Sequence, residues 1–414
     1  SDPVNHGWLC DKGRFNFESV KNDQRLTEPM VKHNGALVPT SWSSALSTAA
    51  NLISQAVKDN GAQSVAIIGG ARGTNEDAYA WSLFAQALGV TNVDAQLDDG
   101  LPASVFGYNQ ATIDQAANAT TVILLSPDLK EELPILYLRL RDASEKKRSK
   151  LIEFAPKQTG ITRYAWKSVA YEPGNQVAVV ASTLADATIA AQVAKGSVVV
   201  VVGRANLAED DSFTMAALDA VMAAAPNATV LPVIRRGNVR GAIETGLVTG
   251  STTSILRSAV AGKINCLILL GADPIADVRD TELARQAMAA VQHVIAIDTF
   301  ASSSSQRADV LLPAAAFGEK DGTTTNLEGR VTQLNRKVNV HGTARPDWMI
   351  ALELADYLGH DLGVGSVQEV HQQLVSKVAA FGDATRAALA INPDGVLLRR
   401  SSGNVSAGSA PTVP

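Results

Sequence analysis

Short apolar runs alternate with longer amphipathic segments from about residue 41 onward. The apolar runs are short and have few polar residues on either face, which is typical of parallel strands covered by helices on both sides. Eight runs have this character: Val65–Ile68, Thr121–Leu125, Leu151–Phe154, Ser197–Val202, Thr229–Ile234, Cys266–Leu270, Val294–Ile297 and Val310–Leu312. The alternation predicts an α/β fold with two doubly wound, mostly parallel-sheet domains.

Capping residues indicate where several of the intervening helices begin. Ser41 precedes an apolar stripe at helical spacing and is a good N-cap. Thr74 and Asp77 have the spacing of a capping box, in which each side chain binds the backbone N–H of the other. Ser366 and Glu369 repeat this spacing ahead of a late helical segment.

The pattern divides the chain into five segments. A turn at Pro173-Gly174 suggests one boundary, and the Ser-, Thr- and Gly-rich stretch Ala301–Arg345 predicts long loops that return over the sheet. We expect a segment without a long periodic pattern at 1–40, a first α/β domain at 41–170, a second or nested α/β domain at 171–300, return loops and a helical segment completing the first domain at 301–400, and a disordered tail at 401–414.

Composition narrows the class of protein. The chain has 414 residues, 46% of them hydrophobic, and a formal net charge of −5, so we expect a folded protein with no nucleic-acid partner. Two distant cysteines, Cys10 and Cys266, exclude a disulfide framework and a cysteine-only metal cluster built by this chain alone. No secretory segment opens the sequence, and no apolar run reaches the ~18 residues needed to span a bilayer. We therefore expect a cytoplasmic protein without direct membrane insertion.

A basic cluster follows one of the predicted helices. It consists of Lys146, Lys147, Arg148 and Lys150. A solvated helix end that complements the helix dipole explains it, and nucleic-acid binding is the alternative.

Three glycine turns follow predicted strands and are the candidate ligand-binding positions. Their residues are Gly69, Gly70, Gly73, Gly203, Arg204, Gly271 and Asp273. The carboxyl ends of parallel strands are where ligands bind in open α/β sheets, and a helix N-terminus there can hold a phosphate. The first turn lacks the spacing of the dinucleotide-binding motif, so a tight strand-to-helix turn is the favoured explanation and phosphate binding is the alternative.

The sequence has no recognisable catalytic constellation. None of the six histidines lies in a zinc-binding motif; His6 and Cys10 are four residues apart, but two ligands do not make a site. Cys266 lies in an apolar run and is expected to be inert core. The polar run Glu319–Asn326 could hold an acid/base pair, or it could be a loop that hydrogen-bonds its own backbone.

Several motifs together resemble those of the molybdopterin oxidoreductase superfamily, with the G subunit of bacterial NADH–quinone oxidoreductase (respiratory complex I) as the most similar branch. The resemblance covers residues 4–360 in order, and its most specific block is Ala308–Val331. The matching segments are Trp8–Phe15, Val38–Trp42, Ala308–Phe317, Glu319–Thr323, Thr325–Val331, Arg345–Trp348 and Leu358-Gly359.

The resemblance implies that residues 1–40 are the remnant of an iron–sulfur domain and its linker, and it assigns a role to Cys10. This residue matches the fourth ligand of a four-iron cluster that some bacterial members of this branch retain, whose other three cysteines would lie upstream of Ser1. A thiolate cluster needs its full ligand set, so we expect no cluster in this chain alone. An iron–sulfur cluster in the full-length protein requires those upstream cysteines; a cut fragment, or a lineage that has lost the site, would each fit this sequence.

The resemblance also bears on molybdopterin. Catalytic members of the superfamily bind a molybdenum or tungsten pterin between two α/β domains, with a Cys, selenocysteine, Ser or Asp on the metal. Here only Asp98 and Asp99 could serve, and the glycine turns would contact the cofactor only if a pterin is retained. We therefore expect no cofactor in this chain.

The implied function is a cofactor-less scaffold in the peripheral arm of NADH–quinone oxidoreductase, which supports electron transfer from NADH to quinone. The expected partners are other subunits of that arm, and the chain would be peripheral to the inner membrane through the complex. The alternative is a catalytic, formate-dehydrogenase-like molybdopterin subunit.

Overall fold

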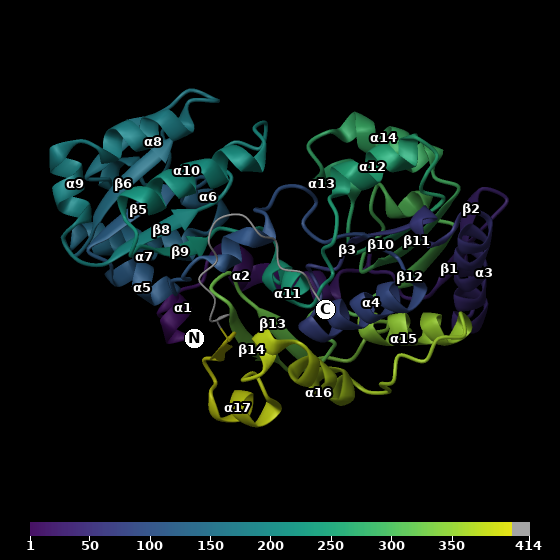
Figure 1. The fold of residues 1–414 in the computed structure, drawn as a ribbon. Coiled ribbons are helices and arrows are strands. Elements are labelled where there is room, and N and C mark those ends of the chain that lie inside the picture. The colour runs from purple at the N-terminus through teal and green to yellow at the C-terminus, as the bar shows by residue number, and fades with distance from the viewer. Residues whose placement is uncertain (400–414) are drawn as a thin grey trace. The chain divides into compact units, whose positions relative to one another are not determined.

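The computed structural model describes residues 1–399, which divide into two compact units (Figure 1). The inserted unit contains residues 1–15 and 99–235, and the main unit contains residues 16–98 and 236–399. Residues 99–235 thus interrupt the main unit in the sequence, and each unit has its own sheet and core.

The main unit is built on a seven-stranded sheet with the order β2-β1-β12-β11-β10-β3-β4. The strands from β12 to β4 are parallel, and the β1–β2 hairpin extends the β12 edge in antiparallel pairing. Their bounds are β1 (Met30–His33), β2 (Ala36–Pro39), β3 (Val65–Gly69), β4 (Asn92–Asp94), β10 (Cys266–Leu270), β11 (His293–Asp298) and β12 (Val310–Pro313).

Nine α-helices and four 3₁₀ helices belong to the main unit within the described residues. The α-helices are α3 (Trp42–Asn60), α4 (Asn75–Leu88), α11 (Val239–Glu244), α12 (Thr252–Val260), α13 (Pro274–Asp277), α14 (Thr281–Ala290), α15 (Asp347–Tyr357), α16 (Val367–Lys377) and α17 (Arg386–Ile391). The 3₁₀ helices are η1 (Asn16–Lys21), η2 (Ala62–Ser64), η5 (Ser305–Arg307) and η6 (Ala379–Phe381).

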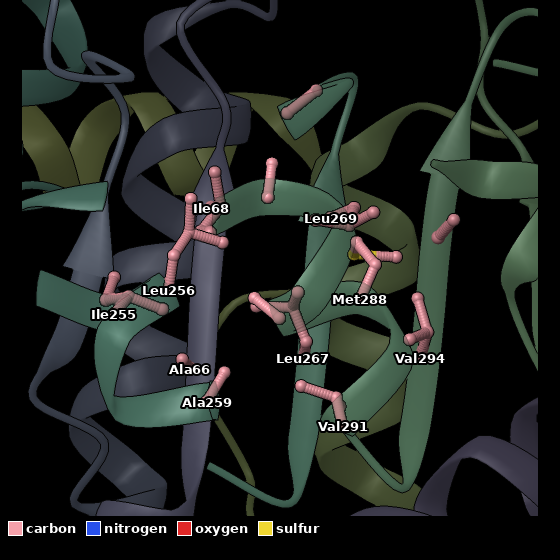
Figure 2. Close-up of a cluster of buried hydrophobic side chains, with 14 of the residues drawn as sticks. Ala66, Ile68, Ile255, Leu256, Ala259, Leu267, Leu269, Met288, Val291 and Val294 are labelled. Atoms are coloured by element: carbon pink, nitrogen blue, oxygen red, sulfur yellow. The ribbon is translucent and has the colours of Figure 1, made fainter. Parts of the chain in front are cut away.

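The core of the main unit explains why its strands are apolar on both faces. In Figure 2, side chains of β3 and β10, such as Ile68, Leu267 and Leu269, lie against those of α12 and α14. Helix α3 contacts β3, β10 and β12, and α15 packs on α3 and α4. Strand positions buried in this way are stabilised by roughly 25 cal/mol for each Å² of apolar surface removed from water.

A second, smaller sheet belongs to the main unit. Its strands are β13 (Gly322–Thr325), β14 (Arg330–Leu334) and β15 (Val396–Leu397), paired in antiparallel fashion in that order. Strand β13 contacts α4 and α11, so this sheet brings the polar run near residue 320 to the start of α4.

The inserted unit is built on a parallel five-stranded sheet with the order β7-β6-β5-β8-β9. Its strands are β5 (Thr121–Leu125), β6 (Lys150–Ala155), β7 (Lys167–Ala170), β8 (Val198–Val202) and β9 (Thr229–Pro232). Its helices are α1 (Asp2–Asn5), α2 (Asp11–Phe15), α5 (Ile113–Asn118), α6 (Leu129–Glu132), α7 (Pro134–Glu145), α8 (Gln176–Leu184), α9 (Ala187–Val193), α10 (Asp211–Ala224), η3 (Ala103–Gly107) and η4 (Thr162–Tyr164).

The predicted α/β fold class is confirmed, because both large sheets are mostly parallel and all eight predicted strands are present. The predicted helix starts at Ser41 and Thr74 also agree with the structure: Ser41 accepts a hydrogen bond from the N–H of Ser44, and Thr74 and Asp77 form a complete capping box. At Ser366 only half of the box forms, since the Glu369 carboxylate accepts from the N–H of Gly365.

The division between units differs from the predicted boundaries at 170/171 and 300/301. The chain leaves the main unit after Asp98 and returns at Arg236, because β10, β11 and β12 join the sheet of β3 rather than that of β8. The turn at Pro173-Gly174 lies between β7 and α8, inside one unit.

Two further segments differ from expectation. Residues 30–39 of the predicted linker form the β1–β2 hairpin of the main sheet. Within the stretch 301–345, β12 coincides with the predicted strand Val310–Leu312, but the β13–β14 hairpin stands where loops were expected. The predicted tail, 401–414, lies outside the described residues.

Within residues 1–399, we find no single helix that is long and apolar enough to span a membrane. Helices α8 and α9 reach that length and composition only when taken together, and their axes are bent by 82°.

Candidate functional site

The first candidate turn, Gly69–Gly73, follows β3 at the carboxyl edge of the main sheet. Gly69 and Gly70 have φ values of +110° and +97°, which glycine adopts without strain. A Cβ at Gly69 would lie 2.2 Å from the carbonyl oxygen of Leu270, and one at Gly70 would lie 2.5 Å from Cδ2 of Leu247. Close packing against the backbone of Leu270 therefore requires Gly69, whereas at Gly70 the positive φ favours glycine, because the end of the Leu247 side chain can move.

Helix α4 starts immediately after this turn with buried acidic residues. Glu76 and Asp77 lie in its first turn and are 1% and 2% exposed. Glu76 accepts hydrogen bonds from the N–H and hydroxyl of Thr323, at 2.7 and 2.8 Å. Carboxylates already complement the positive end of this helix, so a phosphate placed there would meet like charge instead of free N–H donors.

Asp77 belongs to a buried group of three charges. The ammonium of Lys320 lies 2.7 Å from a carboxylate oxygen of Asp77 and 2.7 Å from one of Asp347. Asp77 also accepts from the backbone N–H of Trp348, so it joins the first turns of α4 and α15. Burial raises the pKa of Asp347, although the nearby ammonium lowers it. Burial alone would lower the pKa of Lys320, but the two carboxylates outweigh it and raise that pKa.

The second candidate turn, Gly271–Asp273, follows β10, the neighbour of β3. Strand order reverses between these two strands, since β4 lies beyond β3 and β11 lies beyond β10. In this kind of sheet such a switch point is the usual place for a ligand. The structure therefore places Gly69, Gly70, Gly73, Gly271 and Asp273 at the neighbouring carboxyl ends of β3 and β10.

Protein groups bind the polar atoms of the second turn. Arg72 donates to the carbonyl of Gly271 at 2.7 Å and to the carboxylate of Asp277 at 3.2 Å. The carboxylate of Asp273 accepts from the backbone N–H groups of Ser303 and Ser304, at 3.0 and 3.1 Å. Arg72 thus bridges the two turns across the switch point.

Asp298 was not predicted as a site residue, and it lies at the carboxyl end of β11. Burial raises its pKa to about 6, partly offset by N–H groups of Thr299 and Phe300 and by the charge of Arg72. A carboxylate immediately after an apolar strand run was the available sequence signal. Such a perturbed acid at the carboxyl edge of a sheet is a candidate functional group.

The third candidate turn, Gly203-Arg204, lies in the inserted unit and not with the other two. A Cβ at Gly203 would lie 2.7 Å from Cβ of Val233, so packing again explains the glycine. The guanidinium of Arg204 donates to the carbonyls of Leu207 and Glu209 in its own loop.

Asp98 and Asp99, the only candidate metal ligands if a pterin were retained, fall in different units. Asp98 accepts from the N–H of Thr253 in the first turn of α12. Asp99 lies 3.8 Å from the guanidinium of Arg235, which also binds Glu132 at 2.6 Å. No group of three or more His, Cys, Asp or Glu side chains suited to a metal is found in residues 1–399.

The two cysteines are free and lie in different surroundings. Cys10, at the start of α2, is half-buried, and its sulfur accepts from the N–H of Gly13 at 3.5 Å. Cys266 is buried in β10, where burial, with a smaller contribution from Asp309, raises its pKa to about 12. That agrees with an inert core thiol.

A known protein family matches most of the chain. The sequence pattern of the family described as "Molybdopterin oxidoreductase" matches residues 25–357. The chain belongs to the molybdopterin oxidoreductase family.

Relatives within the molybdopterin oxidoreductases carry several names. NADPH-Fe(3+) oxidoreductase subunit alpha of Geobacter sulfurreducens is 28% identical, over 92% of this chain and 55% of the relative. The G subunit of the NADH-quinone oxidoreductase of Streptomyces coelicolor is 29% identical, over 97% of this chain and 54% of the relative. F420-dependent formate dehydrogenase 1 subunit alpha of Methanococcus maripaludis is 25% identical, over 94% of this chain and 71% of the relative. The chain spans about half the length of the first two relatives.

A solved structure of the same fold is acetylene hydratase from Pelobacter acetylenicus. It superposes with a TM-score of 0.65 at 14% sequence identity, over 85% of this chain and 64% of that one. At this identity the likeness concerns the fold alone.

Proposed function

We propose that this molybdopterin oxidoreductase domain is a cofactor-free structural part of the G subunit of an NADH–quinone oxidoreductase. In that role it would stand in the peripheral arm and support the modules that pass electrons from NADH to quinone. The observation that carries the proposal is the first turn of α4, where Glu76 and Asp77 occupy the helix N-terminus next to the first glycine turn.

The other candidate groups support the same proposal. Arg72 and Asp273 are bound by protein atoms at the switch point, and Arg204 is bound within its own loop. A pterin dinucleotide would have to displace these contacts and bring phosphates near Glu76 and Asp77. The residues therefore fit a protein-filled site better than a pterin site, and we derive no catalytic step through a cofactor.

Partners and location follow from the proposed role. The relatives with these names are subunits, so we propose partner subunits of the peripheral arm, on the cytoplasmic side of the inner membrane. Cys10 would bind an iron–sulfur cluster only together with upstream cysteines of the full-length protein.

The alternative is a catalytic, formate-dehydrogenase-like subunit. The Methanococcus maripaludis relative favours it, because it is matched over a larger share of its length than the other two relatives. Asp98 or Asp99 would then have to exchange its bond to Thr253 or Arg235 for a metal.

Elemental analysis of the full-length protein, purified in its complex, separates the two functions. We expect iron, with no molybdenum, tungsten or releasable pterin in proportion to this subunit. Molybdenum or tungsten near one per subunit, together with pterin fluorescence, would overturn the scaffold function. Asp98→Ala and Asp99→Ala should then lower the metal content.

A further inference from the structure

His371 on α16 lies against the first turn of α4. Its Nδ1 is 2.8 Å from Oε1 of Glu76, and its Nε2 is 3.0 Å from the carbonyl oxygen of Ala384. The two side chains are 4% and 1% exposed, so water cannot replace either contact cheaply. The imidazole therefore joins α4 to the turn that follows η6.

The hydrogen-bond pattern requires a proton that a neutral histidine does not have. A neutral imidazole has one N–H and one lone pair, whereas a carboxylate and a carbonyl are both acceptors. Glu76 already accepts from the N–H and hydroxyl of Thr323, as an ionised carboxylate would. Both contacts of His371 form only when Nε2–H donates to Ala384 and a further proton lies between Nδ1 and Glu76.

We propose that this shared proton is a pH-sensitive latch, which holds the C-terminal segment 366–399 on α4. When the proton leaves, one of the two contacts places a nitrogen lone pair against an oxygen lone pair. These repel each other, so the segment is held less tightly on α4. Histidine is the side chain that ordinarily changes charge between pH 5 and 8, so we expect the segment to be held less tightly on α4 as the pH rises through that range.

A cavity of about 140 Å³ lies over the latch. Glu76 and His371 line it, together with Thr323 of β13, Val367 of α16 and Leu389 of α17. Opening the latch lets water reach Glu76 through this cavity. The far end of the segment keeps its own bonds, since Leu398 donates to Gly329 and Arg399 donates to Ala380.

The other charged groups around the latch are carboxylates, guanidinium and ammonium groups. Asp321 and Arg386 line the same cavity, and Asp77, Lys320 and Asp347 form the buried group beside Glu76. On α16 itself, Glu369 binds the N–H of Gly365, and Lys377 lies in the last turn. Next to Ala384, the carboxylate of Asp383 lies 2.6 Å from the guanidinium of Arg399. The His371→Gln variant below separates the response of the histidine from that of these groups.

Hydrogen exchange of the full chain between pH 6 and 8 tests the latch. After correction for the intrinsic exchange rate, protection of the α16 amides should fall by up to about tenfold per pH unit, which is the limit for one proton. His371→Gln should remove this slope. His33→Gln, which removes an exposed imidazole from β1, should retain it.

Glu76→Gln gives the sharpest result. The new amide can donate to Nδ1 of a neutral imidazole while its oxygen still accepts from Thr323, so α16 should become better protected as the pH rises. The sign of the slope therefore reverses. A structural contact without a shared proton would give the same slope in wild type and Glu76→Gln.

Nitrogen-15 NMR of histidine-labelled protein provides an independent measurement on the wild type, which holds even if His371→Gln fails to fold. We expect the buried imidazole, identified by its shift in Glu76→Gln, to carry protons on both nitrogens at pH 6, or one proton shared with Glu76. A buried imidazole with one N–H and a bare Nδ1 at pH 6, while α16 remains protected, would overturn the latch.

Discussion

Gly69 lets β3 and β10 pack at a distance that no other residue permits. Its missing Cβ would lie 2.2 Å from a backbone oxygen, and a backbone atom cannot rotate out of the way as a side chain can. The carbonyl it faces, on Leu270, also accepts the N–H of Gly70 at 2.8 Å. The glycine turn is therefore part of the sheet's construction, independent of any phosphate.

Gly69→Ala should destabilise the main unit by about 3 kcal/mol, since it combines a positive φ with a steric clash. Gly89→Ala is the matched control, because Gly89 has a φ of +69° but its Cβ would meet only an ordinary contact at 3.7 Å. It should cost about 1 kcal/mol. Urea unfolding measures both, and equal losses would show that packing around Gly69 yields easily.

Asp298 should make stability depend on pH. Its pKa is about 6 in the folded chain, above the ordinary value of 3.8, so between pH 4 and 6 the folded state holds a proton that the unfolded state has released. Stability therefore falls as the pH rises through this window, by roughly 2–3 kcal/mol in total. The loss levels off about one pH unit above the folded-state pKa.

Asp298→Asn should remove this part of the pH dependence. Asp94 and Asp347, whose pKa values are also raised, remain in both proteins, so the difference between the two curves isolates Asp298. The measurement is the free energy of unfolding in urea at intervals from pH 4 to 7. Parallel curves would contradict the burial of an ionisable carboxyl at this position.

At the scale of elements, β13 connects the small sheet to α4 through one of its faces. Thr323 is 3% exposed and donates to Glu76 while it accepts from the Nδ2 group of Asn75 at 2.9 Å. Thr324 points to the other face, where its hydroxyl lies 3.3 Å from that of Thr332. The alternation of the strand thus separates a buried polar face from a partly exposed one.

Thr323→Val should therefore cost about 2 kcal/mol, because it leaves buried partners on Asn75 and Glu76 unsatisfied. Thr324→Val is the matched control on the same strand and should change stability by less than about 0.5 kcal/mol. Both replacements keep the β-branched shape, so thermal unfolding compares hydrogen bonding alone. Equal effects would mean that the Thr323 hydroxyl is dispensable.

Local sequence patterns predicted the strands and helix starts well, but they did not predict which distant segments these elements contact. The eight apolar runs became strands because burial on both faces leaves a continuous signal, and Thr74 with Asp77 became a cap because that interaction spans three residues. The polar run near residue 320 was harder, since its partners Asn75, Glu76 and Asp77 are more than 240 positions away in the sequence. Nothing within the run itself identifies them.

At the scale of the whole molecule, the positions where the chain leaves and returns lie close together within each unit. In the main unit Arg236 donates to the carbonyl of Gln96 at 2.8 Å. In the inserted unit Arg235 lies 3.8 Å from Asp99. An inserted segment needs its two ends close together, because the main unit can then form its sheet without interruption on either side of the insertion. The predicted boundary at 170/171 missed this, since strand order depends on pairing between distant segments.

The insertion makes a prediction about fragments. Residues 99–235 contain all five strands of one sheet and its core, so this fragment should fold and unfold in one cooperative transition. It lacks residues 1–15, whose carbonyls at Pro3 and Val4 bind Arg139, and its stability should be reduced accordingly.

Residues 171–300 are the matched control of similar length. That fragment joins β8 and β9 of one sheet to β10 and β11 of the other, so each half would expose a strand edge and a core face. Circular dichroism during heating should show a sharp transition for 99–235 and none for 171–300, and the reverse result would restore the boundary that the sequence pattern favoured.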